Sequence, residues 1–395
     1  ALSRCKLVPV PAWDYVGDKL KAISFDPPTR IRSRGITGWV QPLPEDPPVA
    51  VAAARSGNRI TVAVERGADA GAARDIAVAT ARPRSAAAIK RANTRWWNRY
   101  WRRVPTIQIP NARLAFLYDY GMYKFASFTN PAGTPATLQG PWIEEYRLPP
   151  WSSDYHFNIN VQMCYQPAYH GNCLEHLMPL FEMIFSWEDV LRHNARVFLG
   201  IDDGAMLPHA VDDRCTCMGG FWSGSVDHAC TAWVALMMWR SYRYSMDRAF
   251  LRRAYPFMCA AMRVYEAMLD RDGNKLALAV GVSPEYRGDA MDAWGTNASF
   301  QLACIHALAE ACCAAAKTLR KPPAPAWARI LKRLPKAALV ENNGRPVIGL
   351  WDGLALEESH RHHSHLAAIT PFDVIDPDSE EWRQVVSDSV ADWIT

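Results

Sequence analysis

The sequence predicts a mostly α-helical protein, because after Pro110 apolar residues recur at spacings of three and four, as in Trp233, Leu236, Met237 and Tyr244. Loops rich in Gly, Pro and Asp separate these stretches, and strand-like alternation is rare and short there. Sequential helices joined by short connections lie beside one another. The chain is therefore predicted to contain an (α/α)6 toroid, built from antiparallel pairs of helices.

The first 85 residues have a different character. They are rich in Pro, Gly, Val and Thr, and the alternating runs 59–64 and 75–80 are predicted to be strands. Residues 1–85 are expected to form the end of a β-sandwich domain, since this length is short for a whole one. From residue 86 the pattern changes, and residues 86–110 are predicted to be a helical linker that contains the aromatic cluster 96–101.

Residues 111–395 are assigned to the helical domain. The helices expected there are 112–128, 158–168, 174–198, 227–244, 247–269, 297–318, 325–334 and 379–393. Six helix pairs need about twelve helices, so the chain is expected to stop before the toroid closes. The first residues lack an initiator Met and the order of a signal peptide, which also indicates a fragment or a processed chain.

Composition and charge argue against several kinds of partner. The net charge of +4 is small and spread along the chain, so neither nucleic acid nor an anionic membrane surface is expected as a partner. No apolar run of about 18 residues predicts a transmembrane span. The 16 tryptophans are an unusual excess, and Trp and Tyr stack on the apolar faces of sugar rings, although filling a helical core is the alternative use.

The first motif is a polar loop that leads into a helix, residues 137–168. Its aromatic and hydrogen-bonding side chains include Trp142, Trp151, His156, Asn158 and Asn160. Apolar walls with a few placed polar groups are typical of a sugar pocket, and two neutral amides can bind a carboxylate and a water without adding charge. The alternative is that Asp154 caps the helix and the asparagines are only cap and turn residues.

The second motif is Ser283-Pro284-Glu285, which follows an apolar run. Proline restricts the residue before it, so Glu285 should be held in a defined place. If Tyr286 and other aromatic residues bury it, its pKa should rise, as a general acid requires. The alternative is a solvated loop carboxylate.

The third motif, residues 360–366, has four histidines within six positions and includes Arg361 and His362. A metal site is the less favoured interpretation, because the His-Glu-x-x-His order of zinc peptidases is absent. Contacts from Arg361 and His362 to sugar hydroxyls are preferred. A second metal alternative joins His228 to three cysteines, Cys215, Cys217 and Cys230, but no matching Cys-x-x-Cys pair accompanies them.

In this order and at these spacings, the three motifs resemble those of glycoside hydrolase family 95, the inverting 1,2-α-L-fucosidases and their relatives. Residues 137–168 are similar to the family's Leu-Gln-Gly-x-Trp-Asn-Glu, Pro-Pro-Trp and His-x-Asn-Ile-Asn-x-x-Met-Asn-Tyr-Trp-Pro-Ala pattern. Residues 283–285 are similar to its Ser-Pro-Glu, and residues 360–366 to its His-Arg-His-Leu-Ser-His-Leu. The resemblance begins at about residue 96 and implies a β-sandwich, a helical linker and an (α/α)6 barrel.

The resemblance also implies roles for individual residues. Glu285 would be the general acid, and Asn158 and Asn160 would position the nucleophilic water and the base. The side chains expected to line the sugar site are Trp142, Trp151, His156, Arg361 and His362. Family members carry an Asp base in a Gln-Ile-Asp-Gly-Asn-Phe-Gly-like segment beyond the His-Arg-His motif, and that segment is absent from these 395 residues. Inversion needs an acid and a base about 6.5–9.5 Å apart, so this chain alone is expected to be inactive.

The sequence thus favours an exo-acting glycosidase that removes a terminal α-L-fucosyl or related L-galactosyl residue from oligo- or polysaccharides with inversion. No metal and no organic cofactor are expected. Family habit indicates a secreted or periplasmic enzyme. The alternatives are another (α/α)6 glycosidase, a phosphorylase, or a catalytically inactive relative that binds carbohydrate.

Overall fold

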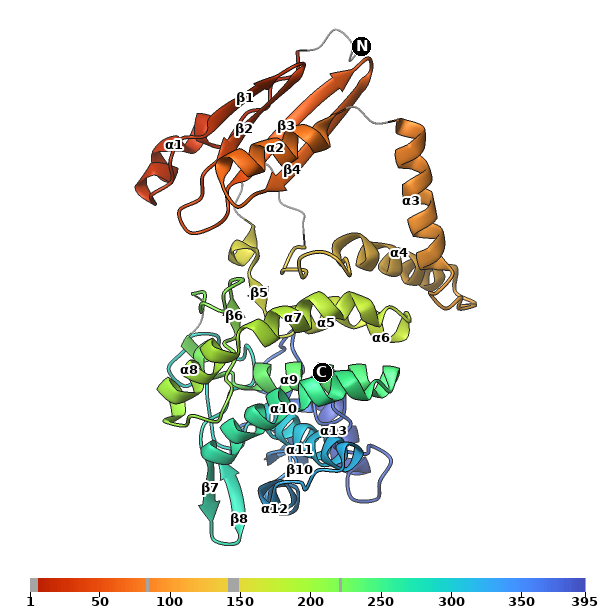
Figure 1. The fold of residues 1–395 in the computed structure, drawn as a ribbon. Helices are drawn as coiled ribbons and strands as arrows, with labels where there is room; N and C mark the ends of the chain where they lie inside the picture. Colours follow the sequence, from red (N-terminus) through yellow and green to blue (C-terminus); the bar gives the residue numbers. More distant parts are fainter. Residues whose placement is uncertain (1–5, 83–84, 141–148, 220–221, 395) are drawn as a thin grey trace. The chain divides into compact units, whose positions relative to one another are not determined.

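The computed structural model describes residues 6–82, 85–140, 149–219 and 222–394. The chain divides into two compact units, Ala1–Trp101 and Arg102–Thr395. This division lies inside the range 86–110 that the sequence assigns to a linker. Helices predominate and the sheets are small, as the sequence predicts (Figure 1).

The first unit contains a four-stranded antiparallel sheet in the order β1-β2-β3-β4. Its elements are α1 (Trp13–Ala22), β1 (Thr29–Ser33), β2 (Ile36–Gln41), β3 (Val49–Ser56), β4 (Arg59–Arg66), α2 (Ala70–Ala81) and α3 (Ala86–Trp101). The strand predicted at 59–64 is confirmed as β4. The helix predicted for the linker is confirmed as α3.

The strand predicted at 75–80 is wrong, because these residues lie within α2. The alternation of Ile76 and Val78 with smaller residues resembles a strand in a short window. Asp69 begins a helix instead, since its side chain accepts a hydrogen bond from Ala72 N at 2.8 Å. The sequence that follows is rich in alanine, which has the highest helix propensity of any residue type.

Helix α2 packs on one face of the sheet, against β2, β3 and β4. Its buried side chains are all alanine and recur every four residues: Ala73, Ala77 and Ala81. They meet small residues of the sheet, including Ala52 and Ala63, in one apolar cluster. Small side chains on both surfaces allow the helix to approach the strands closely.

The described part of this unit therefore has one sheet with a helix on one face, where the sequence predicts the end of a β-sandwich. On β4, Ala63 faces the helix, while Ile60, Val62 and Val64 alternate with it and are exposed. An alternating strand directs successive side chains to opposite faces. On β4 these three apolar side chains thus form an exposed stripe on the face opposite Ala63.

The second unit contains most of the predicted helices. They are α4 (Ala112–Phe128), α5 (Asn160–Tyr165), α6 (Pro167–His170), α7 (Met178–Ser186), α8 (Glu188–Leu199), α9 (Ala229–Ser245), α10 (Arg248–Met268), α11 (Ser299–Leu319), α12 (Pro325–Arg333) and α13 (Arg383–Ile394). The helices predicted at 112–128, 227–244, 247–269, 297–318 and 325–334 are confirmed to within two residues at each end. The ranges 158–168 and 174–198 are each broken into shorter helices.

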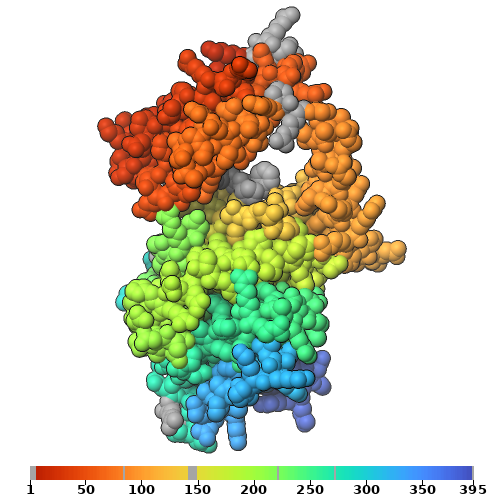
Figure 2. Space-filling model, in the orientation of Figure 1, coloured from red at the N-terminus to blue at the C-terminus, as the bar shows by residue number. Residues whose placement is uncertain are grey.

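Helices α9, α10, α11 and α12 form the core of this unit (Figure 1). Helix α11 contacts α9, α10 and α12, and apolar residues such as Met258, Leu302 and Leu308 are fully buried between them. The segments from α7 to α12 form a continuous surface in the space-filling view (Figure 2). By length and composition alone, α11 is apolar enough to cross a membrane. Its buried residues contact three neighbouring helices, which is the environment of a core helix.

Short antiparallel ribbons join the helices. They are β5 (Tyr155–His156) with β6 (Ala210–Val211), β7 (Leu269–Asp272) with β8 (Lys275–Leu278), and β9 (Leu339–Asn342) with β10 (Arg345–Ile348). Four 3-10 turns complete the description: η2 (Pro150–Ser153), η3 (Leu174–Leu177), η4 (Trp222–Val226) and η5 (Ser364–Leu366).

Candidate active site

The ribbon of β5 and β6 brings together two histidines that are 53 positions apart. His156 pairs with Ala210 across the ribbon, and Phe157 N donates a hydrogen bond to His209 O at 2.7 Å. The two imidazoles consequently meet, with their Nε2 atoms 3.1 Å apart. Gly224 leaves room for this arrangement, since a Cβ there would lie 3.2 Å from His209 Cγ.

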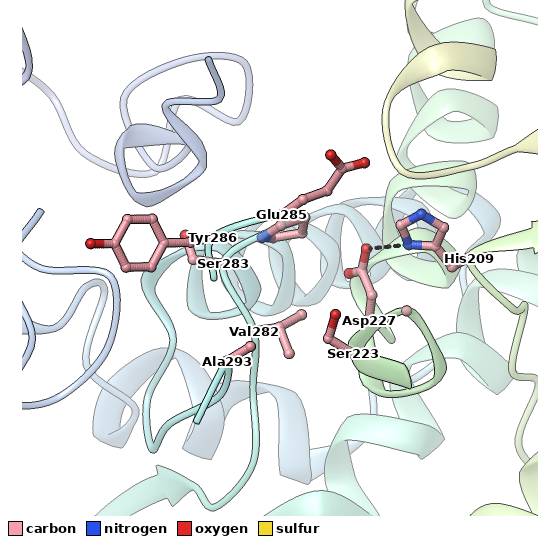
Figure 3. A pocket seen from close by; sticks show the side chains of 10 residues that line it. His209, Ser223, Asp227, Val282, Ser283, Glu285, Tyr286 and Ala293 are labelled. Carbon is pink, nitrogen blue, oxygen red and sulfur yellow. Dashed lines mark hydrogen bonds and ion pairs between the residues drawn. The ribbon is translucent and has the colours of Figure 1, made fainter. Parts of the chain in front are cut away.

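Each of these imidazoles also faces a buried carboxylate. His156 Nδ1 lies 3.2 Å from Asp154 Oδ1, and His209 Nδ1 lies 3.2 Å from Asp227 Oδ2 (Figure 3). An ionised carboxylate only accepts hydrogen bonds, so each Nδ1 carries a proton and donates it. Both pairs lie in the interior, with Asp154 5% and Asp227 2% exposed.

The carboxylate of Glu285 lies beside this histidine pair and is held from three directions. Asn158 Nδ2 donates a hydrogen bond to Glu285 Oε1 at 2.8 Å. Arg361 Nη2 forms an ion pair with Glu285 Oε2, and His362 Nε2 lies 3.6 Å from the same oxygen. The three sequence motifs thus meet at this carboxylate, because Asn158 of the first motif and Arg361 of the third both contact Glu285 of the second.

The expected rise in the pKa of Glu285 is wrong. The interaction with the His362 imidazole lowers the pKa of Glu285 below its usual range, and the charges of Arg361, His362 and His209 lower it further. Burial raises the pKa but is outweighed. In the unliganded site Glu285 is therefore held as a carboxylate.

Two serines join the segment around Glu285 to the segment around Arg361. Ser283 Oγ and Ser364 Oγ are 2.7 Å apart, and Ser364 Oγ donates to Pro284 O at 3.1 Å. Tyr286 adds a buried ring, and its hydroxyl accepts a hydrogen bond from Glu357 N at 3.3 Å. These contacts explain how Arg361 reaches the carboxylate of Glu285, which lies 76 positions away in the sequence.

The Asn158-Ile159-Asn160 segment turns sharply into α5. Ile159 has φ 137°, a conformation that a β-branched residue rarely adopts, and it separates the buried Asn158 from the half-buried Asn160. Asn160 begins the helix, and the described structure records no hydrogen bond of its side chain to Glu285. The alternative in which Asp154 caps the helix is wrong, because Asp154 faces His156 instead.

The predicted aromatic wall is described only in part. The exposed ring of Trp151 lies 5.8 Å, centre to centre, from the ring of His156. Trp142 lies outside the described residues. A pocket beside these groups is lined by His209, Ser223, Asp227, Val282, Ser283 and Glu285 (Figure 3).

The metal alternatives drawn from the sequence do not assemble in the described parts of the chain. Neither the histidines of 360–365 nor the pair Cys215 and Cys217 bring three ligand atoms together there. Two other groups do so: His156 with His209 and Glu285, and His209 with Asp227 and Cys230.

Sequence reasoning missed His209 and Asp227. Both lie in loops, at 207–209 and 226–228, whose residues show no spacing that suggests chemistry. His228, which the sequence offered as a metal ligand, is fully buried and contacts Val280 O at 3.2 Å. An imidazole and a carboxylate on separate loops carry no local signal, since their meeting depends on the path of the chain.

Comparisons with known proteins identify the family of this chain. The model of the glycosyl hydrolase family 95 catalytic domain matches residues 95–392. Over 159 residues the chain is 31% identical to a probable alpha-fucosidase A from Aspergillus niger, a match that spans 40% of this chain and 20% of the relative. Over 183 residues it is 30% identical to alpha-L-fucosidase 2 from Arabidopsis thaliana, spanning 43% of this chain and 20% of the relative.

The matches to these curated relatives therefore span about a fifth of their length. The family model, in contrast, spans most of this chain and includes Asn158, Glu285 and Arg361. This chain belongs to glycosyl hydrolase family 95 and contains residues of its catalytic domain.

Proposed function

We propose that this chain is part of an inverting α-L-fucosidase, which removes a terminal α-L-fucosyl or related L-galactosyl residue from oligo- or polysaccharides. The observation that carries the proposal is the carboxylate of Glu285, on which Asn158, Arg361 and His362 converge. The names of the two relatives support the choice of sugar.

Glu285 is assigned the role of proton donor to the glycosidic oxygen. Its side chain is only 12% exposed, whereas that of Arg361 is 71% exposed. A sugar bound beside Glu285 would draw Arg361 to its hydroxyl groups and replace the ion pair with Glu285. The carboxyl group would then lose a positive neighbour, which favours its protonated form.

Asn158 and Asn160 are assigned to the water and the base. Asn158 donates one N–H to Glu285, and Asn160 is the first residue of α5. An inverting enzyme needs a second carboxylate about 6.5–9.5 Å from the acid. Asp154 and Asp227 face imidazoles, so neither is assigned as this base.

We also propose that the second unit is part of an (α/α)6 toroid. Consecutive helices contact each other, as α9 does α10 and α11 does α12. Adjacent contacts of this kind are typical of stacked helix pairs. The site lies in loops and ribbons between these helices, where such a fold places its functional residues.

The test is the stereochemistry of cleavage by the protein encoded by the whole open reading frame. An α-1,2-fucosylated oligosaccharide is supplied, and the anomer released first is identified by NMR. The β anomer is expected, and the α anomer would contradict the proposal. Phosphate-dependent turnover would indicate a phosphorylase, and binding without turnover an inactive relative.

The role of Glu285 is tested by Glu285→Gln in the same protein. Loss of a general acid lowers turnover by about 10²–10⁴-fold. The matched control is Glu358→Gln, which changes an exposed carboxylate of the same neighbourhood. Equal activity of the two variants would remove Glu285 from the mechanism.

A further inference from the structure

We propose a binding site for a divalent transition-metal ion of the zinc class at Nε2 of His156, Nε2 of His209 and the carboxylate of Glu285. The three ligand atoms lie within 4.8 Å of one another. Two of the residues come from facing ends of the β5–β6 ribbon, and the third comes from the loop before α11. The site is thus formed by three separate segments of the second unit.

The distance between the two imidazoles suits a shared metal ion. Zinc binds histidine nitrogen at about 2.0–2.1 Å, so two such ligands in a tetrahedron lie about 3.3 Å apart. The Nε2 atoms of His156 and His209 are 3.1 Å apart. The Glu285 carboxylate lies within 4.8 Å of these nitrogens, and Glu285 and His209 line the same pocket (Figure 3).

The orientation of the rings supports the same conclusion. The ring centres are 4.7 Å apart and the ring planes cross at 87°. Rings aligned end to end along the line between the Nε2 atoms would have centres farther apart, because each ring would add its full radius. At least one Nε2 lone pair therefore points away from that line, as it does when two imidazoles converge on a third atom.

The carboxylates behind the two histidines prepare them as ligands. Asp154 and Asp227 each accept a hydrogen bond from Nδ1 of one imidazole, so each ring in its neutral form presents an Nε2 lone pair. A carboxylate behind a histidine in this way orients the ring and increases the basicity of the metal ligand. Two such Nε2 atoms 3.1 Å apart can share either a proton or a metal ion.

The local charge also favours a cation. Asp154, Asp227 and Glu285 bring three carboxylates, and Oδ1 of Asp227 is buried without a hydrogen-bond partner among the described residues. Arg361 is the one permanently charged group in contact with Glu285 in the described structure. Imidazole with a carboxylate suits Zn²⁺ and its neighbours, whereas Mg²⁺ and Ca²⁺ prefer oxygen ligands.

Metal binding would engage the carboxylate that the proposed reaction needs as a proton donor. The metal ion and the sugar should therefore compete, and the ion should inhibit the enzyme. This consequence rests on the proposed function. The binding itself does not, because it can be measured without substrate.

The first experiment is isothermal titration of this chain with ZnCl₂ under reducing conditions. Binding of one ion to the pocket is expected. His209→Asn removes a ligand, and Asp227→Asn removes the carboxylate behind it. The Asp227 variant should weaken binding about 10–100-fold, and the His209 variant should weaken it more. His193→Asn changes an exposed histidine on α8 and serves as the matched control.

Circular dichroism establishes that each variant is folded. If His209→Asn does not fold, Glu285→Gln replaces it, because glutamine has the same shape as glutamate and lacks the negative charge. Binding that is unchanged in these variants would overturn the site and assign Zn²⁺ to other histidines or cysteines. Absence of Zn²⁺ binding to the folded chain would also overturn it and indicate a proton shared by the two imidazoles. Mg²⁺ binding as tight as Zn²⁺ would contradict the ligand set.

Inhibition is measured separately, on the protein encoded by the whole open reading frame. Added Zn²⁺ should raise the apparent KM for the fucosylated substrate, and a chelator should reverse the effect. If Zn²⁺ binds but the protein has no hydrolase activity, the proposed function fails and the metal site stands. If the enzyme is active but Zn²⁺ does not bind, the metal site fails alone.

Discussion

Two regions contact Glu285, and they differ in how the protein holds them. The inner wall consists of His156, Asn158, His209 and Asp227, each less than 10% exposed. His209 contacts both His156 and Asp227, and Asn158 is hydrogen-bonded to Glu285. The outer arm, residues 360–363, approaches the same carboxylate from solvent, and the Arg361 side chain is 71% exposed. The inner wall therefore sets the position of the carboxylate. The outer arm can exchange partners with a ligand.

The largest expected effect concerns His365, a buried residue that closely follows the outer arm in the sequence. Burial, with the charges of His363 and His360, lowers the pKa of His365 from 6.5 to about 4. The unfolded chain takes up this proton first as the pH falls, so stability is full above about pH 6.5 and is lost toward pH 4. Protonation of His365 alone should lower the free energy of unfolding by about 3 kcal/mol over this range.

Urea unfolding at pH 7 and pH 4.5, compared between the chain and His365→Asn, measures this effect. The variant should lose less stability than the original chain over that interval, whatever its stability at pH 7. The exposed His193→Asn is the control and should follow the original chain. Equal losses of stability in all three proteins would contradict the lowered pKa of the buried His365.

Asp227→Ala should have the next largest effect, because it breaks the inner wall. The substitution leaves His209 Nδ1 without its buried partner, which costs about 1–3 kcal/mol. Thermal or urea unfolding gives the change. Asp292→Ala, which removes an exposed partner of Arg287, should cost less than about 1 kcal/mol. A similar cost for both would show that the inner wall is not held more firmly than the surface.

Asn158→Ala and Asn160→Ala divide one motif between its buried and half-buried members. Asn158 loses a hydrogen bond to a carboxylate, and the free energy of unfolding should fall by about 1–2 kcal/mol. Asn160→Ala should change it by less than about 0.5 kcal/mol, since alanine is favourable within a helix. Chemical denaturation of the two variants side by side gives the difference, and the reverse order would contradict the assignment of Asn158 to the wall.

Arg361→Ala should have the smallest effect on stability, below about 0.5 kcal/mol, because the Arg361 side chain is 71% exposed and Glu285 keeps its hydrogen bond from Asn158. Sugar binding by the protein encoded by the whole open reading frame should nevertheless weaken, since the proposed ligand contact is lost. Unfolding and calorimetric titration measure the two quantities. A large loss of stability would place Arg361 with the inner wall.

Much of the second unit was accessible from the sequence. Helices leave a repeat of three and four residues that a short window reveals, so α4, α10, α11 and α12 were predicted with nearly their observed bounds. The same local reasoning failed at α2, where a run of alanines with Ile76 and Val78 gave an alternation that the helix cap at Asp69 overrides. The three motifs were also visible, because each lies within one stretch of chain.

The sequence by itself determined most of the long helices of the second unit, the three motifs and the family to which they belong. Only the tertiary structure decided that His209 and Asp227 join the site, that Asp154 faces His156, and that cationic neighbours lower the pKa of Glu285. The physical reason is distance along the chain. Periodicity and spacing are local properties, whereas hydrogen bonds and charge interactions depend on which distant segments the ribbon of β5 and β6 and the buried core bring into contact.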